Sequence, residues 1–428
     1  MTRRENPGRP THTLGKRIVL YTMTALVCFG TGGCFDREEL EQQAFVTSLG
    51  IDSAPGGLVD CTFQIAVPKA ASGGSGGGGG GSEPLAGKGP ITVRSKTVMD
   101  ALALGNVGVE RTLTLTHLNS VIIGESLAKE GLLPTIRPMM RYREFRRTMY
   151  VKIAKGNARE VMANDKPMLE TTNTRVPDGV QFVGKKTGMA PVSSRLQDLA
   201  IAMESPHEAA VLPVYALNQS VKADPKGEEG IHGDLTYKPG EIARNGGNPV
   251  EYVGGAVLDG DKLVGFLDGQ QVMALRFLRG SMNRARMDVP DPTDKTKFIS
   301  LSVRRERRPN YQIQLGQPVK ISITIPLDAD LIGIGSGSNL TLPGPQVRLE
   351  TTVDEHIQSM TSSLIEEWAK KGIDIVPIST HIRGKFLTDA QFAKYPWQSR
   401  LKDADIKVRV QVHIRRFGLQ TAPMNSGV

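Results

Sequence analysis

Cysteine is scarce in this chain of 428 residues, which has three, Cys28, Cys34 and Cys61. Their number excludes a disulfide scaffold, and their spacing fits no zinc-site template. Aromatic residues make up only 5% of the chain, and no apolar run reaches the ~20 residues that a membrane-spanning helix needs. A mean hydropathy of -0.22 excludes a polytopic membrane protein, whereas 39% hydrophobic residues exclude a wholly disordered chain.

The N-terminus has the three parts of a secretory signal. Residues 1–17 carry five basic residues against one acid, residues 18–29 are apolar and without charge, and small residues follow from Gly30. A basic segment, a short apolar segment and a small-residue cleavage site are typical of exported proteins. We therefore predict that residues 1–33 are a signal peptide.

Cys34 is the predicted site of lipid attachment. Gly32 and Gly33 before it resemble a bacterial lipobox, although Thr31 stands where that motif usually has leucine. In a lipobox the thiol takes a diacylglyceryl group, and cleavage makes the cysteine the new N-terminus. Acyl chains contribute ~0.8 kcal/mol per buried CH₂ and would hold the protein at a membrane. Two alternatives stay open, namely an ordinary signal with an incidental cysteine and an uncleaved anchor.

The net charge does not indicate a nucleic-acid partner. It is +9 for the whole chain, but the signal carries +4 of it, so the mature chain has +5. Such a mild excess suits an anionic lipid surface. The densest basic stretches, 141–147 and 304–308, are both interrupted by glutamate. Within the first, Glu144, Arg146 and Arg147 form a predicted partner-docking surface, with a solvated face or an internal salt bridge as the alternative.

The predicted fold class is α+β, multi-domain, with mainly antiparallel sheets and helices packed on one face. We predict an N-terminal domain over 34–217 that contains a flexible Gly/Ser loop at 73–82. A linker or middle segment at 218–250, a C-terminal domain over 251–420 and a tail at 421–428 follow.

Period-two and helical patterns predict the elements of both halves. Predicted strands cover 44–51, 59–67, 91–95, 113–123, 148–154, 252–258, 262–267, 299–304, 311–315, 318–325, 346–353 and 406–414. Predicted helices cover 97–105, 125–141 with a break at Gly131, 157–163, 268–278 and 354–371. Thr352 and Glu355 are expected to form a capping box for the last helix, and Gly372 to end it.

The residues that carry chemistry do not form a catalytic or metal-binding pattern. The seven histidines never recur at i, i+4, and no phosphate-binding glycine loop is followed by lysine. Glu366 and Glu367 are adjacent on a predicted helix, so they point apart and form no acid–base pair. We expect no cofactor, no metal site and no enzymatic activity.

The mature chain resembles the Ger(x)C, or GerC-type, family of spore germination lipoproteins over nearly all its length. The similarity is carried in order by CFDREEL at 34–40, AFV at 44–46, LGID at 49–52, HLNSVIIGESLAKEG at 117–131, REFRRT at 143–148, AKGNA at 154–158, GGAV at 254–257, DKLVGFL at 261–267 and RRFG at 415–418. The sequence departs from the family's Phe-Gly-rich pattern after Asp374. The local structure of 374–385 is therefore left open.

The resemblance implies the C subunit of a nutrient germinant receptor, required for assembly or signalling and without catalysis. Such receptors combine this lipoprotein with two integral membrane subunits, of A and B type. The implied location is the outer face of the spore inner membrane, with lipid bound through Cys34. The sequence does not identify the germinant. The alternatives are a solute-binding lipoprotein of a transporter and a surface-anchored hydrolase.

Overall fold

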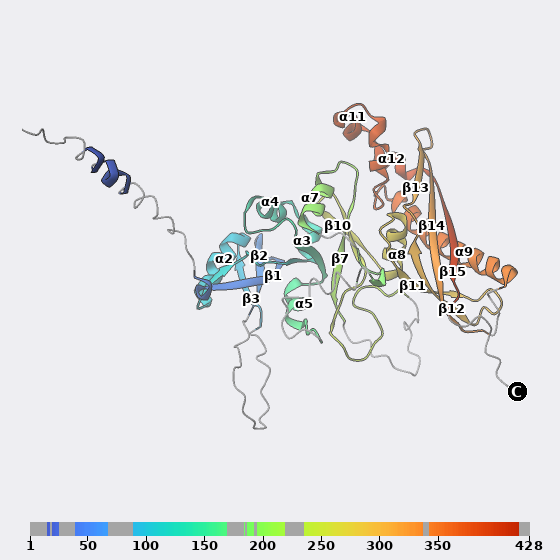
Figure 1. Ribbon diagram of the computed structural model, residues 1–428, viewed down its shortest axis with the longest axis horizontal. Helices are drawn as coiled ribbons and strands as arrows, with labels where there is room; N and C mark the ends of the chain where they lie inside the picture. Colours follow the sequence, from blue (N-terminus) through green and yellow to red (C-terminus); the bar gives the residue numbers. More distant parts are fainter. Residues whose placement is uncertain are drawn as a thin grey trace, which may run out of the picture. The chain divides into compact units, whose positions relative to one another are not determined.

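The computed structural model describes residues 15–17, 19–24, 39–66, 89–168, 184, 186–191, 195–218, 235–336 and 342–418 (Figure 1). The chain divides into two compact units, Met1–Gln43 and Ala44–Val428. Within the described part of the first unit, residues 15–17 and 19–24 are helical and η1 (Leu40–Gln42) is a short 3-10 helix. None of the described helices is long and apolar enough to cross a membrane. Cys34, the loop at 73–82 and the tail at 421–428 lie outside the described residues.

The second unit contains two β-sheets. The strands of the larger sheet are β1 (Gln43–Ala54), β2 (Leu58–Ile65), β3 (Ile91–Ser95), β4 (Thr112–Thr114), β5 (Ser120–Gly124), β6 (Tyr150–Lys155), β7 (Ala210–Leu217), β8 (Val250–Glu251), β9 (Gly255–Asp259) and β10 (Lys262–Leu267). Those of the smaller sheet are β11 (Ala285–Pro290), β12 (Phe298–Arg305), β13 (Asn310–Gln314), β14 (Lys320–Ile334) and β15 (Asp405–Arg416).

Helices connect and cover these strands. In the first half they are α2 (Val98–Gly105), η2 (Asn106–Gly108), α3 (Glu125–Glu130), α4 (Leu133–Arg141), α5 (Ala158–Asn164) and α7 (Leu196–Glu204). In the second half they are α8 (Gly269–Leu278), α9 (Pro343–Lys370), α10 (Ile378–Ile382), η3 (Arg383–Lys385), α11 (Asp389–Lys394) and α12 (Trp397–Lys402). Helices and sheets of this kind confirm the predicted α+β class.

The larger sheet runs in the order β10-β9-β7-β6-β5-β1-β2-β3. The predicted hairpins β1–β2 and β9–β10 form with antiparallel pairing. The centre differs from the expectation, because β1–β5, β5–β6 and β6–β7 are parallel pairs. The second hairpin joins this sheet through the pairing of β7 with β9, although its sequence belongs to the second half of the chain.

Helices lie on both faces of the larger sheet, not on one. Successive residues of β5 show why: Val121 and Ile123 pack with α3, α4 and α7, whereas Ile122 packs with α5 in a separate cluster. Neighbouring side chains of a strand point to opposite faces, and parallel strands are joined by crossover helices that cover them. The parallel centre therefore has apolar residues on both sides.

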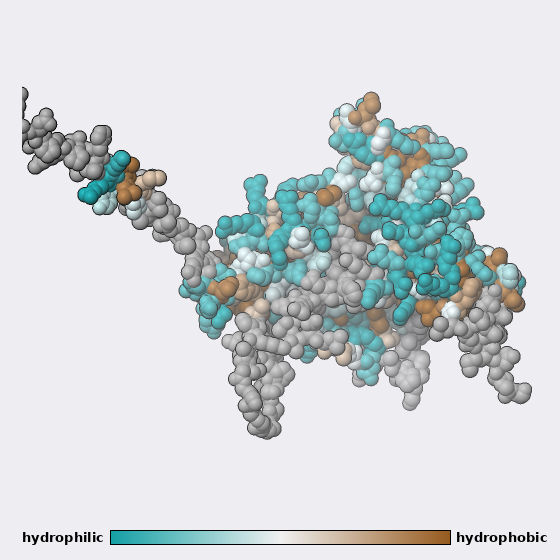
Figure 2. Space-filling view, viewed as in Figure 1, coloured by the Kyte–Doolittle hydropathy of each residue, from teal (hydrophilic) through white to brown (hydrophobic). Residues whose placement is uncertain are grey.

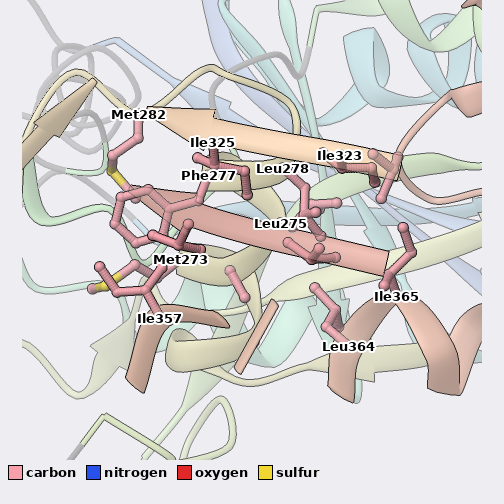
Figure 3. Close-up of a cluster of buried hydrophobic side chains, with 14 of the residues drawn as sticks. Met273, Leu275, Phe277, Leu278, Met282, Ile323, Ile325, Ile357, Leu364 and Ile365 are labelled. Atoms are coloured by element: carbon pink, nitrogen blue, oxygen red, sulfur yellow. The ribbon is translucent and has the colours of Figure 1, made fainter. Parts of the chain in front are cut away.

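Residues 272–278 of helix α8 are all buried, and Figure 3 shows its apolar side chains together with those of β14 and α9. Its apolar residues pack against Val211 and Val257 of the larger sheet and against strand β14 and helix α9 of the second half. Asp268 caps the helix, because its side chain accepts a hydrogen bond from Gln271 N–H at 2.7 Å. The predicted helix over 268–278 is confirmed.

Two predicted strands and one predicted helix cap have different structures. Residues 346–353, expected as a strand, lie inside α9, where Leu349, Val353 and Ile357 recur at helical spacing on its buried side. The capping box of Thr352 is absent, because its hydroxyl instead donates to Arg348 O within the helix, at 3.0 Å. The strand expected over 113–123 is two strands, β4 and β5.

The end of α9 agrees with the sequence. Gly372 has a φ of +75°, and the N–H of Ile373 bonds to Trp368 O at 3.0 Å. Glycine adopts this left-handed conformation without the strain that a Cβ atom brings, which ends the helix in a Schellman motif. The closing strand β15 also has its predicted alternation of buried and exposed residues.

Side chains of α9 bond to the outer edge of β15. Glu350, Asp354 and Gln358, one helical turn apart, accept hydrogen bonds from the backbone N–H groups of Ile414, Val412 and Val410 at 2.8, 2.7 and 3.4 Å. We call these contacts the α9–β15 ladder. Unpaired strand edges attract other strands, so the ladder protects this edge with the chain's own helix.

The ladder contains a carboxyl group whose ionisation opposes folding. Burial raises the pKa of Asp354 from its ordinary 3.8 to about 6. The folded chain thus binds this proton more tightly than the unfolded chain. The resulting stabilisation is complete below about pH 4 and is lost as the pH rises through about 6.

We expect Asp354→Asn to raise the free energy of unfolding at about pH 7 by about 1 kcal/mol, a value that allows for solvent screening of a half-buried group. At about pH 4 the variant and the original chain should have equal stability, because both are then uncharged at this position. Urea unfolding followed by circular dichroism measures the difference. Gln358→Ala removes a neighbouring contact without a titrating group, so its effect should not change with pH. An equal gain for Asp354→Asn at both pH values would contradict the assignment.

Candidate functional site

The predicted docking residues Glu144, Arg146 and Arg147 share the loop between α4 and β6. The Glu144 carboxylate is directed into the protein, where it accepts hydrogen bonds from Leu115 N–H at 2.8 Å and from the Tyr142 hydroxyl at 2.6 Å. It therefore fixes this loop to the segment before β5. The structure brings the three residues together but gives Glu144 an internal role.

The two arginines of this loop remain exposed. Arg146 donates to Leu118 O and Arg147 to the Gln197 side chain, each at 3.3 Å. Neither forms an ion pair with another described residue, and single contacts of this length leave most guanidinium N–H groups available. Docking through Arg146 and Arg147 stays a prediction.

A groove lies in the second half between α8, α9 and β11. Its larger part has a volume of about 740 Å³ and its smaller part about 290 Å³, and Gln270, His356 and Met360 line both. The walls of the larger part are mainly apolar and include Met273 and Met287. Grooves of this size and composition take apolar chains or extended segments.

The polar groups that line the groove include His356, Gln271 and Glu367. Burial lowers the pKa of His356, so its imidazole is neutral near pH 7. The side chain of Gln271 donates a hydrogen bond to Glu367 at 3.3 Å. No group of three His, Cys, Asp or Glu side chains that could hold a metal occurs in the part of the chain that the structure describes.

Asp374 is the centre of a buried polar junction between the two halves. Its carboxyl accepts hydrogen bonds from Ile378 N–H at 2.9 Å, from Ser379 N–H at 2.7 Å and from Trp397 Nε1–H at 3.0 Å. Its backbone carbonyl accepts from Ala209 N–H at 3.1 Å, at the start of β7. Burial raises the pKa of Asp374 against the effect of these donors.

Charged groups around Asp374 complete the junction. Arg279, after the end of α8, donates from Nε to Ile375 O at 2.9 Å. Burial lowers the pKa of Arg279, whereas the negative charges of Glu208 and Asp374 act in the opposite direction. Buried charges are tolerated where hydrogen bonds and opposite charges compensate for lost hydration. The segment 374–385, left open by the sequence, is thus an ordered structural joint that contains α10 and η3.

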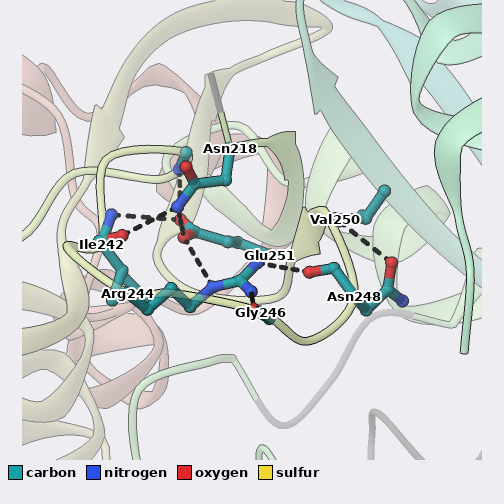
Figure 4. Close-up of polar contacts among 8 residues, drawn as sticks. Asn218, Ile242, Arg244, Gly246, Asn248, Val250 and Glu251 are labelled. Carbon is teal, nitrogen blue, oxygen red and sulfur yellow. Dashed lines mark hydrogen bonds and ion pairs between the residues drawn. The ribbon is translucent and has the colours of Figure 1, made fainter. Parts of the chain in front are cut away.

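Glu251 holds the segment 235–250 against the larger sheet (Figure 4). Its carboxylate accepts from Gly240 N–H at 2.7 Å, from Arg244 Nε at 3.4 Å and from the Asn218 amide. Arg244 in turn donates to the backbone carbonyls of Gly246 and Asn248. Glu251 as a whole is 4% exposed, and its contacts are structural.

Cys61 is buried in β2, as the sequence predicts. Burial, with smaller effects of Asp60 and Asp52, raises the pKa of its thiol to about 12. A thiol that stays protonated is a poor nucleophile. Sequence reasoning missed the groove and the Asp374–Trp397 contact, because their residues are far apart in the chain and share no motif.

Known proteins match both halves of the chain. Residues 36–217 match a family model described as the spore germination protein N-terminal domain, and residues 253–418 match one described as spore germination B3/GerAC-like, C-terminal. Spore germination protein KC of Bacillus subtilis (strain 168) is 24% identical over 418 residues, which cover 96% of this chain and 98% of that protein. Spore germination protein B3 of the same organism is 22% identical over 415 residues, 95% of this chain and 98% of that protein. The crystal structure of the GerBC protein aligns with a TM-score of 0.49 and 17% identity over 89% of this chain and 99% of that one.

The contact between Trp397 and Asp374 predicts that the two tryptophans, Trp397 and Trp368, contribute differently to stability. Trp397→Phe removes one of three donors to the buried Asp374 carboxyl and should lower the free energy of unfolding by about 1–3 kcal/mol. Trp368→Phe is the matched control, because Trp368 is equally buried and its Nε1–H has no hydrogen-bond partner within the described residues. Urea unfolding monitored by circular dichroism compares the two variants. Equal losses would show that the Asp374 contact adds nothing beyond ring packing.

Proposed function

Because the chain belongs to the GerC-type family of spore germination proteins, we propose that it is the lipid-anchored C subunit of a nutrient germinant receptor. The family makes it a component of a germinant receptor and not an enzyme. The observation that carries the proposal is that both family models match, in order and over 36–217 and 253–418. A solute-binding lipoprotein has no comparable support.

The proposed anchor is the lipidated thiol of Cys34, after removal of residues 1–33. The lipobox-like Gly32-Gly33-Cys34 and the basic N-terminus support it. Two or more acyl chains hold a protein stably at a bilayer. The proposed location is the outer face of the spore inner membrane. Membership of the family supports the broader statement that the protein is associated with the spore.

The proposed role is non-catalytic assembly or signalling with two integral membrane subunits, of A and B type. The exposed guanidinium groups of Arg146 and Arg147 are the proposed docking surface, held in place by the internal contacts of Glu144. We also propose the domain boundaries 34–217, 218–250 and 251–420. They follow composition and turn patterns, while the pairing of β7 with β9 links the outer two segments.

We expect Cys34→Ala to abolish incorporation of a clickable palmitate probe and to move the protein from the membrane to the soluble fraction. The change removes the sulfur that would carry the diacylglyceryl group. Cys61→Ala is the control, because that buried thiol lies within β2 and should leave labelling unchanged. Unchanged labelling of Cys34→Ala would refute the anchor.

The receptor role predicts a selective germination defect. Spores of the producing organism that lack this chain should lose the response to one class of nutrient and still germinate with a non-nutrient trigger, as followed by the fall in optical density. Normal nutrient germination, with no second gene of this family present, would contradict the proposal.

Complementation of these spores tests the docking surface. A chain with Arg146→Glu and Arg147→Glu should restore the nutrient response at least about fivefold more slowly than the original chain, because rim charges control association. Arg307→Glu with Arg308→Glu is the matched control, since both lie exposed in the loop between β12 and β13. Immunoblots establish equal amounts of protein. Equal rates for both double variants would refute docking through Arg146 and Arg147.

A further inference from the structure

Within the described residues, strand β11 is paired along one edge only. It is the first strand in the order β11-β12-β14-β13 of the smaller sheet, and among the described residues only β12 pairs with it. Strand β15 pairs in parallel with β14, and its own outer edge is protected by the α9–β15 ladder. An unprotected edge presents backbone donors and acceptors to another strand.

The pairing of β11 with β12 identifies which backbone groups face outward. Asp291 N–H bonds to Lys297 O at 3.0 Å, which makes this pair a hydrogen-bonded one. Hydrogen-bonded positions alternate along an antiparallel pair, so Met287 and the other odd-numbered residues bond to β12. The N–H and C=O groups of Arg286 and Asp288 therefore point to the open edge, and Pro290 offers only its carbonyl.

The larger part of the groove runs beside this edge and leaves room for another strand. Arg286, Asp288 and Pro290 line it together with Phe298, and its volume is about 740 Å³. Phe298 is 59% exposed, an apolar side chain with little cover in the described part of the protein. An extended chain laid here would find backbone partners on one side and apolar contacts on the other.

The charges of β11 are arranged so that the strand is complementary to a second, antiparallel copy of itself. Arg286 and Asp288 are two residues apart, so both side chains lie on the same exposed face. The Ser300 hydroxyl donates to the Asp288 carboxylate at 2.6 Å and fixes it on that face. A strand that carries one positive and one negative residue in this arrangement matches an antiparallel copy of itself.

Only one two-fold register uses this complementarity. Outward-facing residues must pair with each other, which allows Arg286 opposite Arg286, Asp288 opposite Asp288, or Arg286 opposite Asp288. The first two place like charges together, which destabilises a strand pair. The third is centred on Met287, pairs opposite charges twice, and lets Arg286 exchange both backbone hydrogen bonds with Asp288 of the partner subunit.

We propose that the protein forms a two-fold dimer through antiparallel pairing of β11 with β11 of a second copy, in the register centred on Met287. The two smaller sheets then become one continuous sheet. The interface is short, because Pro290 cannot donate at its end. It belongs to the small, reversible class of protein contacts, so association is expected at micromolar concentrations.

Charge reversal tests the register. Sedimentation equilibrium of the full chain in detergent should show a monomer–dimer equilibrium at concentrations up to about 100 µM. Arg286→Asp and Asp288→Arg should each raise the dissociation constant at least about tenfold, because each places like charges opposite each other twice. The combined Arg286→Asp, Asp288→Arg chain should return to within about threefold of the original, and the exposed Arg307→Asp should have no effect.

A cysteine pair gives a second, independent test in membranes from cells that produce the chain. In the proposed register the two Met287 Cα atoms are about 4.5 Å apart, within disulfide reach, so Met287→Cys should give a dimer that reducing agent separates. Asn283→Cys is the control, because its two copies would lie about 27 Å apart. A monomer at every concentration, a dimer unchanged by both charge reversals, or equal cross-linking of the two cysteine variants would overturn the proposal.

Discussion

The burial of helix α8 between two sheets is the constraint on which the second unit depends. A helix buried on every side must be apolar around its whole circumference and have both ends satisfied. Residues 272–278 are all buried and meet the first condition except at Arg276, whose guanidinium donates to a backbone carbonyl. Val272, Leu275 and Phe277 are among the buried apolar side chains. Asp268 meets the second at the start of the helix. Each such apolar side chain contributes about 1.5–3 kcal/mol when it leaves water.

The polar groups near α8 follow from the same constraint. Arg276 is 1% exposed and donates to the carbonyl of Gly184 at 2.7 Å. Arg279 donates to Ile375 O and faces Glu208 and Asp374. Asp374 in turn receives Trp397 and the start of α10. Charges that cannot reach water are each given partners, and these partners come from both halves of the chain, which ties the halves together.

The described surface is largely hydrophilic. Hydrophilic side chains cover most of the surface formed by β14 and β15 in Figure 2, and Lys407, Arg409 and His413 are exposed there. Arg146 and Arg147 are exposed on their loop, and the groove beside β11 is mainly apolar. A germinant receptor component that acts by binding partners needs such surfaces and a rigid frame to hold them.

Local sequence determined the elements whose signals are local. The turn residues of the two hairpins, the cap at Asp268, the glycine at position 372 and the alternation of β15 all act within a few residues, so these elements were predicted correctly. The resemblance to the family also rested on short segments and on their order along this chain. The lipid-attachment prediction at Cys34 rests on sequence alone.

Tertiary structure decided what depends on neighbours distant in sequence. Residues 346–353 fit a strand or a helix, and packing against α8 and β15 made them helical. The short alternating segment 285–290 was assigned no element, because its pairing with β12 is what makes it a strand. The parallel centre of the larger sheet, the groove and the contact between Asp374 and Trp397 likewise join residues tens of positions apart. Such contacts leave no periodic pattern, because each is set by the geometry of the folded chain.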